Sequence, residues 1–189
     1  MAAVMQAGLA QLAPPVRDGG KPLISARRIG KRVRQLGEQV SQLYADSEQP
    51  LVLVVVLKGA TVFAADLLRS LSIPAELEFV RASSYGRGSQ SSGRVKLAHM
   101  VDGPLTGRDI LLVEDIVDSG RTINVIRKEL KSHKPASLRL VALLDRPARR
   151  ELPVQIDFTG FTIPDRFVVG YGLDYAGLYR ELPGVHALG

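Results

Sequence analysis

The chain has 189 residues, of which 46% are hydrophobic, and a formal net charge of +6 at pH 7. This composition suffices for one domain with a sizeable core, which excludes disorder as the main state. The absence of cysteine excludes disulfides, thiolate catalysis and cysteine-ligated zinc. The positive charge favours anionic partners, so nucleic acid, polyphosphate and nucleotide substrates all stay open.

The first 21 residues are expected to form a flexible extension. No basic residue precedes their apolar part, and Gln6 and Gln11 interrupt it, so they are unlike a signal peptide. The longest apolar run, LVLVVVL at 51–57, is far shorter than the ~20 residues of a membrane-spanning helix. A soluble cytoplasmic protein with no membrane partner is therefore expected.

Residues 25–45 predict an amphipathic helix with Ser25 as its N-cap. Apolar residues recur there at helical spacing: Ile29, Val33, Leu36, Val40 and Leu43. The same segment contains the basic run ARRIGKRVR at 26–34. A solvated helix face explains this run better than an RNA-binding groove, because only five Phe and five Tyr are available for base stacking.

The chain then alternates strands and helices. The predicted elements are strands at 51–59, 75–85, 94–101, 109–116 and 138–145 and helices at 61–71 and 123–133. Unalternating apolar strands separated by helices predict an α/β fold with a mostly parallel sheet, covered on both faces. Ligands of such sheets bind at the carboxyl ends of the strands. The Gly- and Tyr-rich residues at about 150–189, together with part of the N-terminal region, predict a small hood over that edge, so that 22–189 form a single domain.

The turn DSGRT at 118–122 follows one of these strands and is suited to hold a phosphate. Gly120 permits a tight bend, and Asp118, Ser119 and Thr122 are candidate caps for a helix that begins near Thr122. Free backbone N–H groups at such a helix start are aimed at an anion. A monophosphate is therefore expected at this turn.

Two acids, Glu114 and Asp115, directly precede the turn, and an ordinary capped helix does not explain them. Carboxylates beside a phosphate suit a ligand that also presents a ribose diol, Mg²⁺ or a proton on a nitrogen. A sugar phosphate with a metal and a nitrogen nucleophile meets all three needs. A Walker A loop is excluded, because Asp115 and Arg121 occupy the places of its first glycine and its lysine.

The run VEDIVDSGRT at 113–122 resembles the 5-phosphoribosyl pyrophosphate (PRPP) signature of type I phosphoribosyltransferases. Taken with LKGA at 57–60, SSYG at 83–86 and DRFVVGYGLDYAGLYREL at 165–182, it is similar to the hypoxanthine-guanine phosphoribosyltransferases of purine salvage. The resemblance covers about residues 22–186. It implies a mostly parallel twisted sheet flanked by helices, with a small hood and a flexible lid loop.

The resemblance implies that Glu114 and Asp115 hold the ribose hydroxyls, while Asp118 faces N7 of the purine as general base. Lys58 offers a point charge for pyrophosphate, and Gly59 lets the backbone approach it. A cis peptide bond is implied at Leu57–Lys58. The expected PRPP-binding residues are Lys58, Gly59, Glu114, Asp115, Asp118, Ser119, Gly120, Arg121, Thr122 and Arg180.

Composition alone makes residues 83–94 a flexible hairpin tip. The resemblance makes them a lid, with Ser84 and Tyr85 as the lid residues, that would keep water from an oxocarbenium-like centre. It also implies Mg²⁺ that bridges pyrophosphate and ribose oxygens. The candidate metal ligands are Glu114, Asp115 and, through water, Asp174.

The purine-binding residues implied by the resemblance lie mainly in the tail. Phe167 would stack on the base, the backbone of Val168 would read its edge, and Asp174 would lie near the purine 2-position. Arg146 stands where the family usually has a lysine that donates to the 6-oxo group. Arginine still donates, but its planar fork is longer, so the ranking of hypoxanthine, guanine and xanthine does not follow.

Together these patterns predict transfer of the phosphoribosyl group of PRPP to N9 of hypoxanthine or guanine, giving IMP or GMP and pyrophosphate. Two alternatives stay open: a phosphoribosyltransferase for xanthine or uracil, and a nucleic-acid-binding regulator that uses the basic helix at 26–34. The sequence FVVGYGLDY favours the purine enzyme over both, so nucleic acid is not an expected partner. The resemblance also implies a homodimer or homotetramer.

Overall fold

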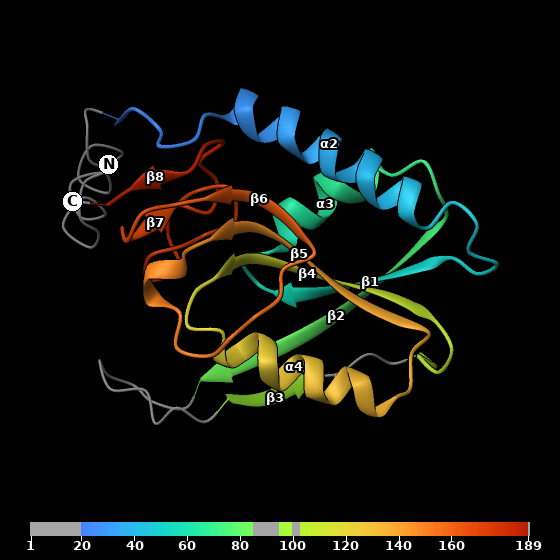
Figure 1. The fold of residues 1–189 in the computed structure, drawn as a ribbon. Helices are drawn as coiled ribbons and strands as arrows, with labels where there is room; N and C mark the ends of the chain where they lie inside the picture. The colour runs from blue at the N-terminus through green and yellow to red at the C-terminus, as the bar shows by residue number, and fades with distance from the viewer. Residues whose placement is uncertain (1–19, 85–94, 100–102, 189) are drawn as a thin grey trace, which may run out of the picture.

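The computed structural model describes residues 20–84, 95–99 and 103–188. Its centre is a six-stranded sheet in the order β3-β2-β1-β4-β5-β6, in which only β3 runs antiparallel (Figure 1). The elements are α2 (Ala26–Leu43), β1 (Leu51–Leu57), α3 (Thr61–Ser70), β2 (Ala75–Ser84), β3 (Val95–His99), β4 (Asp109–Val117), α4 (Arg121–Ser132), β5 (Ser137–Asp145), η2 (Pro147–Arg149), β6 (Phe158–Thr162), β7 (Val168–Val169) and β8 (His186–Ala187). The predicted α/β class is confirmed.

Helices cover both faces of the sheet, which explains why β1 is apolar at every position and why β4 and β5 each carry a continuous apolar run. Figure 1 shows α2 and α3 on one face and α4 on the other. Along β1, Leu53 and Val55 point into the core beneath α2 and α3, whereas Val52 and Val54 point into the core beneath α4. The two cores hold the strand ends in fixed positions.

Helix α2 begins as its sequence predicts, with the Ser25 hydroxyl accepting a hydrogen bond from the Arg28 N–H at 3.4 Å. The prediction for its last turn is wrong. Leu43 is 47% exposed, and Tyr44 is buried in its place. The Tyr44 hydroxyl lies 3.4 Å from Ser137 Oγ, so a ring with a polar tip fills the space that helical periodicity gave to leucine.

The sequence analysis did not predict β6, which lies inside the segment that it assigned to the hood. This strand pairs in parallel with β5 and forms one edge of the main sheet. Its sequence, FTGFT, lacks the continuous apolar character of the central strands. Arg32 of α2 donates to the Gly160 and Thr159 carbonyls of β6, at 3.1 and 2.5 Å, and so covers this edge.

Residues 163–188 follow β6 and are called the hood below. The hood contains the antiparallel pair β7-β8 and is joined to the start of the chain through Ile24 and Val185. These two residues exchange backbone hydrogen bonds of 3.1 and 2.9 Å. In Figure 1, β7 and β8 lie near the carboxyl ends of β4, β5 and β6. No helix among the described residues is long and apolar enough to span a membrane.

Candidate active site

The turn after β4 has the geometry that a bound phosphate requires. Gly120 adopts φ +85°, and a Cβ at this position would lie 2.6 Å from the Leu152 carbonyl oxygen, so only glycine fits there. Helix α4 begins at Arg121, with Gly120 as an N-cap that makes no side-chain capping bond. The first N–H groups of α4 are therefore available to an anion.

The predicted side-chain caps of α4 require correction. Asp118 does not cap the helix, because both of its carboxylate oxygens accept from Arg146. Ser119 Oγ accepts from the Arg121 N–H at 3.4 Å, which is a long hydrogen bond. The tight bend leaves the short side chains before α4 free to face other groups.

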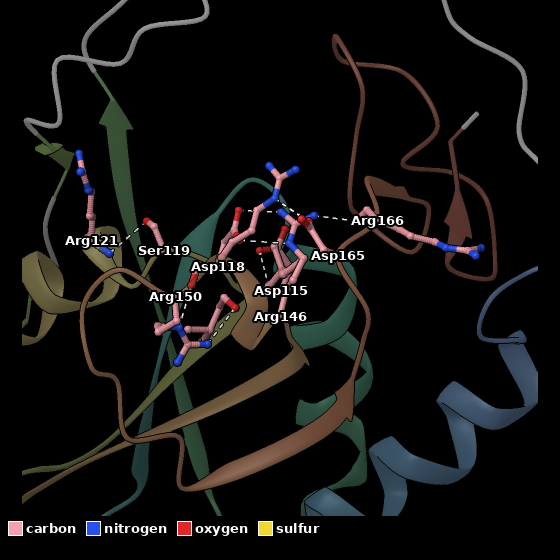
Figure 2. Close-up of polar contacts among 11 residues, drawn as sticks. Asp115, Asp118, Ser119, Arg121, Arg146, Arg150, Asp165 and Arg166 are labelled. Atoms are coloured by element: carbon pink, nitrogen blue, oxygen red, sulfur yellow. Dashed lines mark hydrogen bonds and ion pairs between the residues drawn. The ribbon is translucent and has the colours of Figure 1, made fainter.

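Arg121 was predicted to contribute to the phosphate site, but its side chain points away from it. The guanidinium pairs with Glu151, with Nε 2.7 Å and Nη2 2.5 Å from Oε2. Figure 2 shows the side chain directed away from Asp118 and Arg146. Only the backbone of Arg121 therefore lies where the helix start meets a phosphate.

Arg150 supports the turn from below, and sequence reasoning missed it. Its Nε donates to the Asp118 carbonyl at 2.8 Å, and its Nη2 donates to the Val117 carbonyl at 3.2 Å and to Asp145 Oδ1 at 2.5 Å (Figure 2). A single cation thus satisfies the carbonyls at the end of β4 and ties them to the end of β5. The basic run after β5 was visible in the sequence, but its partners are distant in the chain.

The two acids before the turn lie at the end of β4, where Glu114 is buried and Asp115 is half-buried. Glu114 is 7% exposed, and its Oε2 has no hydrogen-bond partner within the part of the chain that the structure describes. Burial raises the pKa of Glu114 well above its ordinary value, and the neighbouring Asp115 adds to this. Burial also raises the pKa of Asp115 to about 6, although the Ile116 N–H donates to its Oδ1 at 2.7 Å. Such groups gain from a cation or hydroxyl donors.

The Lys58–Gly59 segment lies against these acids. The peptide bond between Leu57 and Lys58 is cis, as the resemblance implied. A Cβ on Gly59 would collide with the carboxylate of Asp115, so the backbone of the segment touches that side chain. Lys58 itself is exposed, and its carbonyl accepts from the Thr61 hydroxyl at 2.8 Å.

Arg146 and Asp118 form a bidentate ion pair between β5 and the turn. Arg146 Nη2 donates to Asp118 Oδ2 at 2.6 Å and Nε donates to Oδ1 at 3.1 Å. Its third nitrogen, Nη1, donates to the Arg166 carbonyl at 2.6 Å (Figure 2). Arg146 is only 6% exposed, so the pair is held in a geometry that a lysine cannot reproduce.

Two cavities adjoin at this edge, and Ile116 lines both. The smaller, of about 60 Å³, is lined by Glu114, Ile116, Val117, Asp118, Ser119, Gly120, Thr122 and Ile123. The larger, of about 210 Å³, is lined by Asp115, Ile116, Arg146, Phe167, Val168, Leu173 and Asp174. The structure thus brings five of the predicted PRPP-binding residues around the smaller cavity and the four predicted purine-binding residues, with Asp115, around the larger. Lys58, Gly59, Arg121 and Arg180 line neither cavity.

Arg180 and Asp174 pair with each other at the hood side of the larger cavity. Arg180 Nη2 lies 2.6 Å from Asp174 Oδ1, and Nη1 donates to the Gly172 carbonyl at 2.5 Å. Both side chains act electrostatically on Asp115, which Arg180 stabilises in its ionised form and Asp174 opposes. Arg180, which was predicted to bind pyrophosphate, therefore lies close enough to Asp115 to interact with its charge.

The site fits Mg²⁺ that is shared with a substrate. No group of three or more potential ligands occurs among the described residues. Mg²⁺ usually takes one or two protein carboxylates and completes its shell with water and substrate phosphates. The unpartnered Glu114 Oε2 and the adjacent Asp115 supply such carboxylates. Of the lid residues, Tyr85 lies outside the described residues, as does the side chain of Ser84.

A larger hollow of about 800 Å³ lies elsewhere, between α2 and the start of β6. Its charged residues are Arg139 and Asp157, and Asp157 already accepts from Arg127, Arg139 and the Leu140 N–H. These residues lie near the amino ends of β5 and β6. The hollow therefore has neither the position nor the unsatisfied groups of a catalytic site.

A mostly parallel sheet whose strand ends bring together a tight turn at a helix start, two acids and an adjoining cavity lined by Phe167 is suited to an enzyme that transfers a phosphorylated sugar to a nitrogen base. The chain belongs to the phosphoribosyl transferase domain family, which it matches over residues 23–176.

Relatives of the chain agree with this class. It is 46% identical over 163 residues to the hypoxanthine phosphoribosyltransferase of Salmonella typhimurium, covering 86% of this chain and 92% of the relative. The structure of a hypoxanthine-guanine phosphoribosyltransferase from Bacillus anthracis superposes with a TM-score of 0.84 at 38% identity, covering 93% of this chain and 100% of the other. The structure of the Trypanosoma cruzi hypoxanthine phosphoribosyl transferase superposes with a TM-score of 0.84 at 38% identity, covering 90% of this chain and 91% of the other.

Proposed function

We propose that the chain is a purine-salvage phosphoribosyltransferase that transfers the phosphoribosyl group of PRPP to N9 of hypoxanthine or guanine. The products are IMP or GMP and pyrophosphate. The observation that carries the proposal is the pair of adjoining cavities, because the Asp118–Arg146 ion pair connects them. Asp118 lines the smaller cavity, which is called the phosphate cavity below, and Arg146 lines the larger, which is called the purine cavity below.

In the proposed reaction the 5′-phosphate lies on the N–H groups of the turn at 118–122, and Glu114 and Asp115 accept from the ribose hydroxyls. The bond between the anomeric carbon and the pyrophosphate oxygen breaks, and a bond to N9 of the purine forms with inversion. The proton of the purine passes from N7 to Asp118. Lys58 and Arg180 hold the departing pyrophosphate. Bound Mg²⁺ would offset the negative charge that develops on it.

The Asp118–Arg146 pair explains how purine binding and proton transfer can be linked. Asp118 already accepts one hydrogen bond from Arg146 on each carboxylate oxygen, so N7–H would meet a carboxylate whose charge the guanidinium offsets. The 6-oxo group of a purine is a second acceptor to which the Arg146 guanidinium can donate. We expect the pair to open when a 6-oxopurine binds, with Arg146 donating to O6 and Asp118 accepting from N7. Phe167, which is 47% exposed, offers its ring for stacking.

A base panel tests the proposal. The protein is incubated with PRPP, Mg²⁺ and each of hypoxanthine, guanine, xanthine and uracil, and pyrophosphate release is measured. Turnover with hypoxanthine or guanine is expected. Turnover with uracil alone would assign the enzyme to pyrimidines. Turnover with xanthine alone would show that the site requires an oxo group at the purine 2-position, which the resemblance places near Asp174.

The rival, an RNA-binding regulator, has less support from the basic segment at 26–34. Arg32 is engaged with β6 carbonyls, and the Arg28 guanidinium lies over the Phe161 ring at 5.6 Å. These cations stabilise α2 against the sheet edge. Steeply salt-dependent RNA binding that disappears on neutralising the exposed Arg27 and Arg34 would support the regulator instead.

Further features are proposed from the resemblance and from the chemistry of ribosyl transfer. Ser84 and Tyr85 are proposed as lid residues, since ribosyl transfer requires the exclusion of water. A homodimer or homotetramer is proposed from the resemblance, and equilibrium sedimentation tests it. A cytoplasmic location and a single domain spanning 22–189 stay predictions.

A further inference from the structure

A buried tyrosine in the hood is tied to helix α3 by a short hydrogen bond. Tyr171 is 7% exposed, and its hydroxyl donates to Asp66 Oδ2 at 2.5 Å. Asp66 also pairs with the exposed Arg69 one turn along α3. The bond joins residues 105 positions apart in the sequence, so it fixes the hood loop against the helix that follows the Lys58–Gly59 segment.

The backbone of Tyr171 is also constrained. Its φ is +51°, which is uncommon for a residue with a side chain, and its N–H donates to the Leu182 carbonyl at 2.7 Å. The next residue, Gly172, has φ +98°, and a Cβ there would collide with the Gly59 carbonyl oxygen. The hood loop therefore presses directly on the Lys58–Gly59 segment.

This contact extends a continuous series of packed groups. Gly59 lies against the carboxylate of Asp115 on its other side. The Gly172 carbonyl accepts from Arg180 Nη1, and Arg180 pairs with Asp174. A displacement of the loop at Tyr171 would thus move Gly59 and Arg180, the two positions that flank Asp115.

We propose that Tyr171 and Asp66 form a positioning pair that sets the geometry of the pyrophosphate subsite without touching substrate. The inference rests on the proposed role of Lys58, Gly59 and Arg180 in binding pyrophosphate. The Tyr171 hydroxyl fixes how far the hood loop approaches the Lys58–Gly59 segment. The pair then affects PRPP and pyrophosphate more than the purine.

The test is Tyr171→Phe, which removes the hydroxyl and keeps the ring. The expected result is a rise of about fivefold to tenfold in the KM for PRPP and in the Kd for magnesium pyrophosphate, from the loss of a hydrogen bond to a charged group. The KM for hypoxanthine should change less than about twofold, which is smaller than the effect of losing one hydrogen bond.

Tyr44→Phe is the matched control. Tyr44 is also a buried tyrosine, 6% exposed, and its hydroxyl contacts Ser137 near the amino end of β5, away from the site. The control should leave PRPP and pyrophosphate binding unchanged even if its melting temperature falls as much as that of Tyr171→Phe. Equal effects of the two variants on pyrophosphate affinity would reduce Tyr171 to a merely structural role and overturn the inference.

Asp66 provides an independent arm if Tyr171→Phe does not fold. Asp66→Ala should raise the Kd for pyrophosphate as Tyr171→Phe does, and the double variant should add little to either, which indicates coupling. Arg69→Gln removes only the exposed partner of Asp66 and should have no effect. Additive losses of pyrophosphate affinity in the double variant, or no loss of affinity in Asp66→Ala, would contradict the proposal that the two residues act as a pair.

The outcome for this pair is separable from that of the proposed function. A wild-type protein without turnover on any base would defeat the function, while pyrophosphate affinity could still be measured by calorimetry. Wild-type turnover with an unchanged Tyr171→Phe variant would defeat the positioning pair alone.

Discussion

Asp118 lies between the phosphate cavity and the purine cavity and is proposed to act in each through different atoms. Its backbone belongs to the turn, whereas its carboxylate faces Arg146. Asp118→Asn keeps the size of the side chain and an oxygen acceptor but cannot take a proton. We expect kcat to fall by about 100-fold or more, as for loss of a general base. The KM for PRPP should change little, because the proposed contacts to its phosphate come from backbone N–H groups.

Steady-state kinetics with PRPP and hypoxanthine measure both quantities. Equal losses in kcat and in PRPP affinity would show that the carboxylate binds the donor instead of accepting the proton.

Arg146 tests which group reads the base. Arg146→Lys keeps the charge but loses the bidentate bond to Asp118 and, with it, the planar fork. We expect the order of kcat/KM among hypoxanthine, guanine and xanthine to change. PRPP affinity should stay within about twofold, because the lost contacts are to the Asp118 carboxylate and not to the backbone N–H groups of the turn. An unchanged order would show that Arg146 does not read the purine.

The acids of β4 make stability depend on pH. Asp115 has a pKa of about 6 in the folded chain, against an ordinary value of 3.8. The folded state therefore binds more protons between these values, and its stability must fall as pH rises from about 4 to about 6. Asp115→Asn removes this loss. We expect it to be more stable than the wild type at pH 7.5 by about 1 to 3 kcal/mol, and nearly equal to it at pH 4.

Urea denaturation at the two pH values measures this difference. An Asp115→Asn variant that is less stable than the wild type at pH 7.5 would mean that the ionised carboxylate is satisfied without a ligand.

At the scale of an element, the turn before α4 depends on one backbone conformation. Gly120→Ala would place a Cβ 2.6 Å from the Leu152 carbonyl at φ +85°, which adds a collision to conformational strain. Gly107→Ala is the matched control, because Gly107 has φ +72° and nothing within 4 Å of its Cβ position. The control should lose only about 1 kcal/mol of stability, because its Cβ introduces conformational strain but no collision.

We expect Gly120→Ala to weaken PRPP binding at least tenfold as measured by calorimetry, whereas Gly107→Ala should bind normally. Normal PRPP binding by Gly120→Ala would place the phosphate away from this turn.

Elements with a strong local signal could be predicted from the sequence. The apolar runs of β1, β4 and β5 and the capped start of α2 depend on periodicity and on Ser25, both of which are local. Strand β6 could not be predicted, because FTGFT is short and is a strand through its pairing with β5. Tyr44 replaced Leu43 in the core for a similar reason, since Ser137 supplies its polar partner.

The same distinction applies to the site. The positions of Glu114, Asp115 and Gly120 follow from a motif that is continuous in the sequence. The support from Arg150 and the pairing of Arg121 with Glu151 depend on the chain that returns after β5. Sequence patterns identified the residues that we propose to meet the ligand, whereas the residues that hold them in place are defined by tertiary contacts.

At the scale of the whole molecule, the site is assembled from four separate parts of the chain. The ends of β1, β4 and β5 contribute Lys58, Asp115 and Arg146, and the hood contributes Phe167 and Asp174. The hood is anchored both to the start of the chain through Ile24 and to α3 through Tyr171, so its loops depend on the entire fold. A ligand that contacts all parts should therefore stabilise the whole molecule cooperatively.

The most direct measurement is a crystal structure of the protein with hypoxanthine and a non-hydrolysable analogue of PRPP with Mg²⁺. We predict the 5′-phosphate on the backbone N–H groups of residues 118–122 and the purine between Phe167 and the opened Asp118–Arg146 pair. A phosphate bound away from that turn, or a purine that leaves the ion pair intact, would contradict this arrangement.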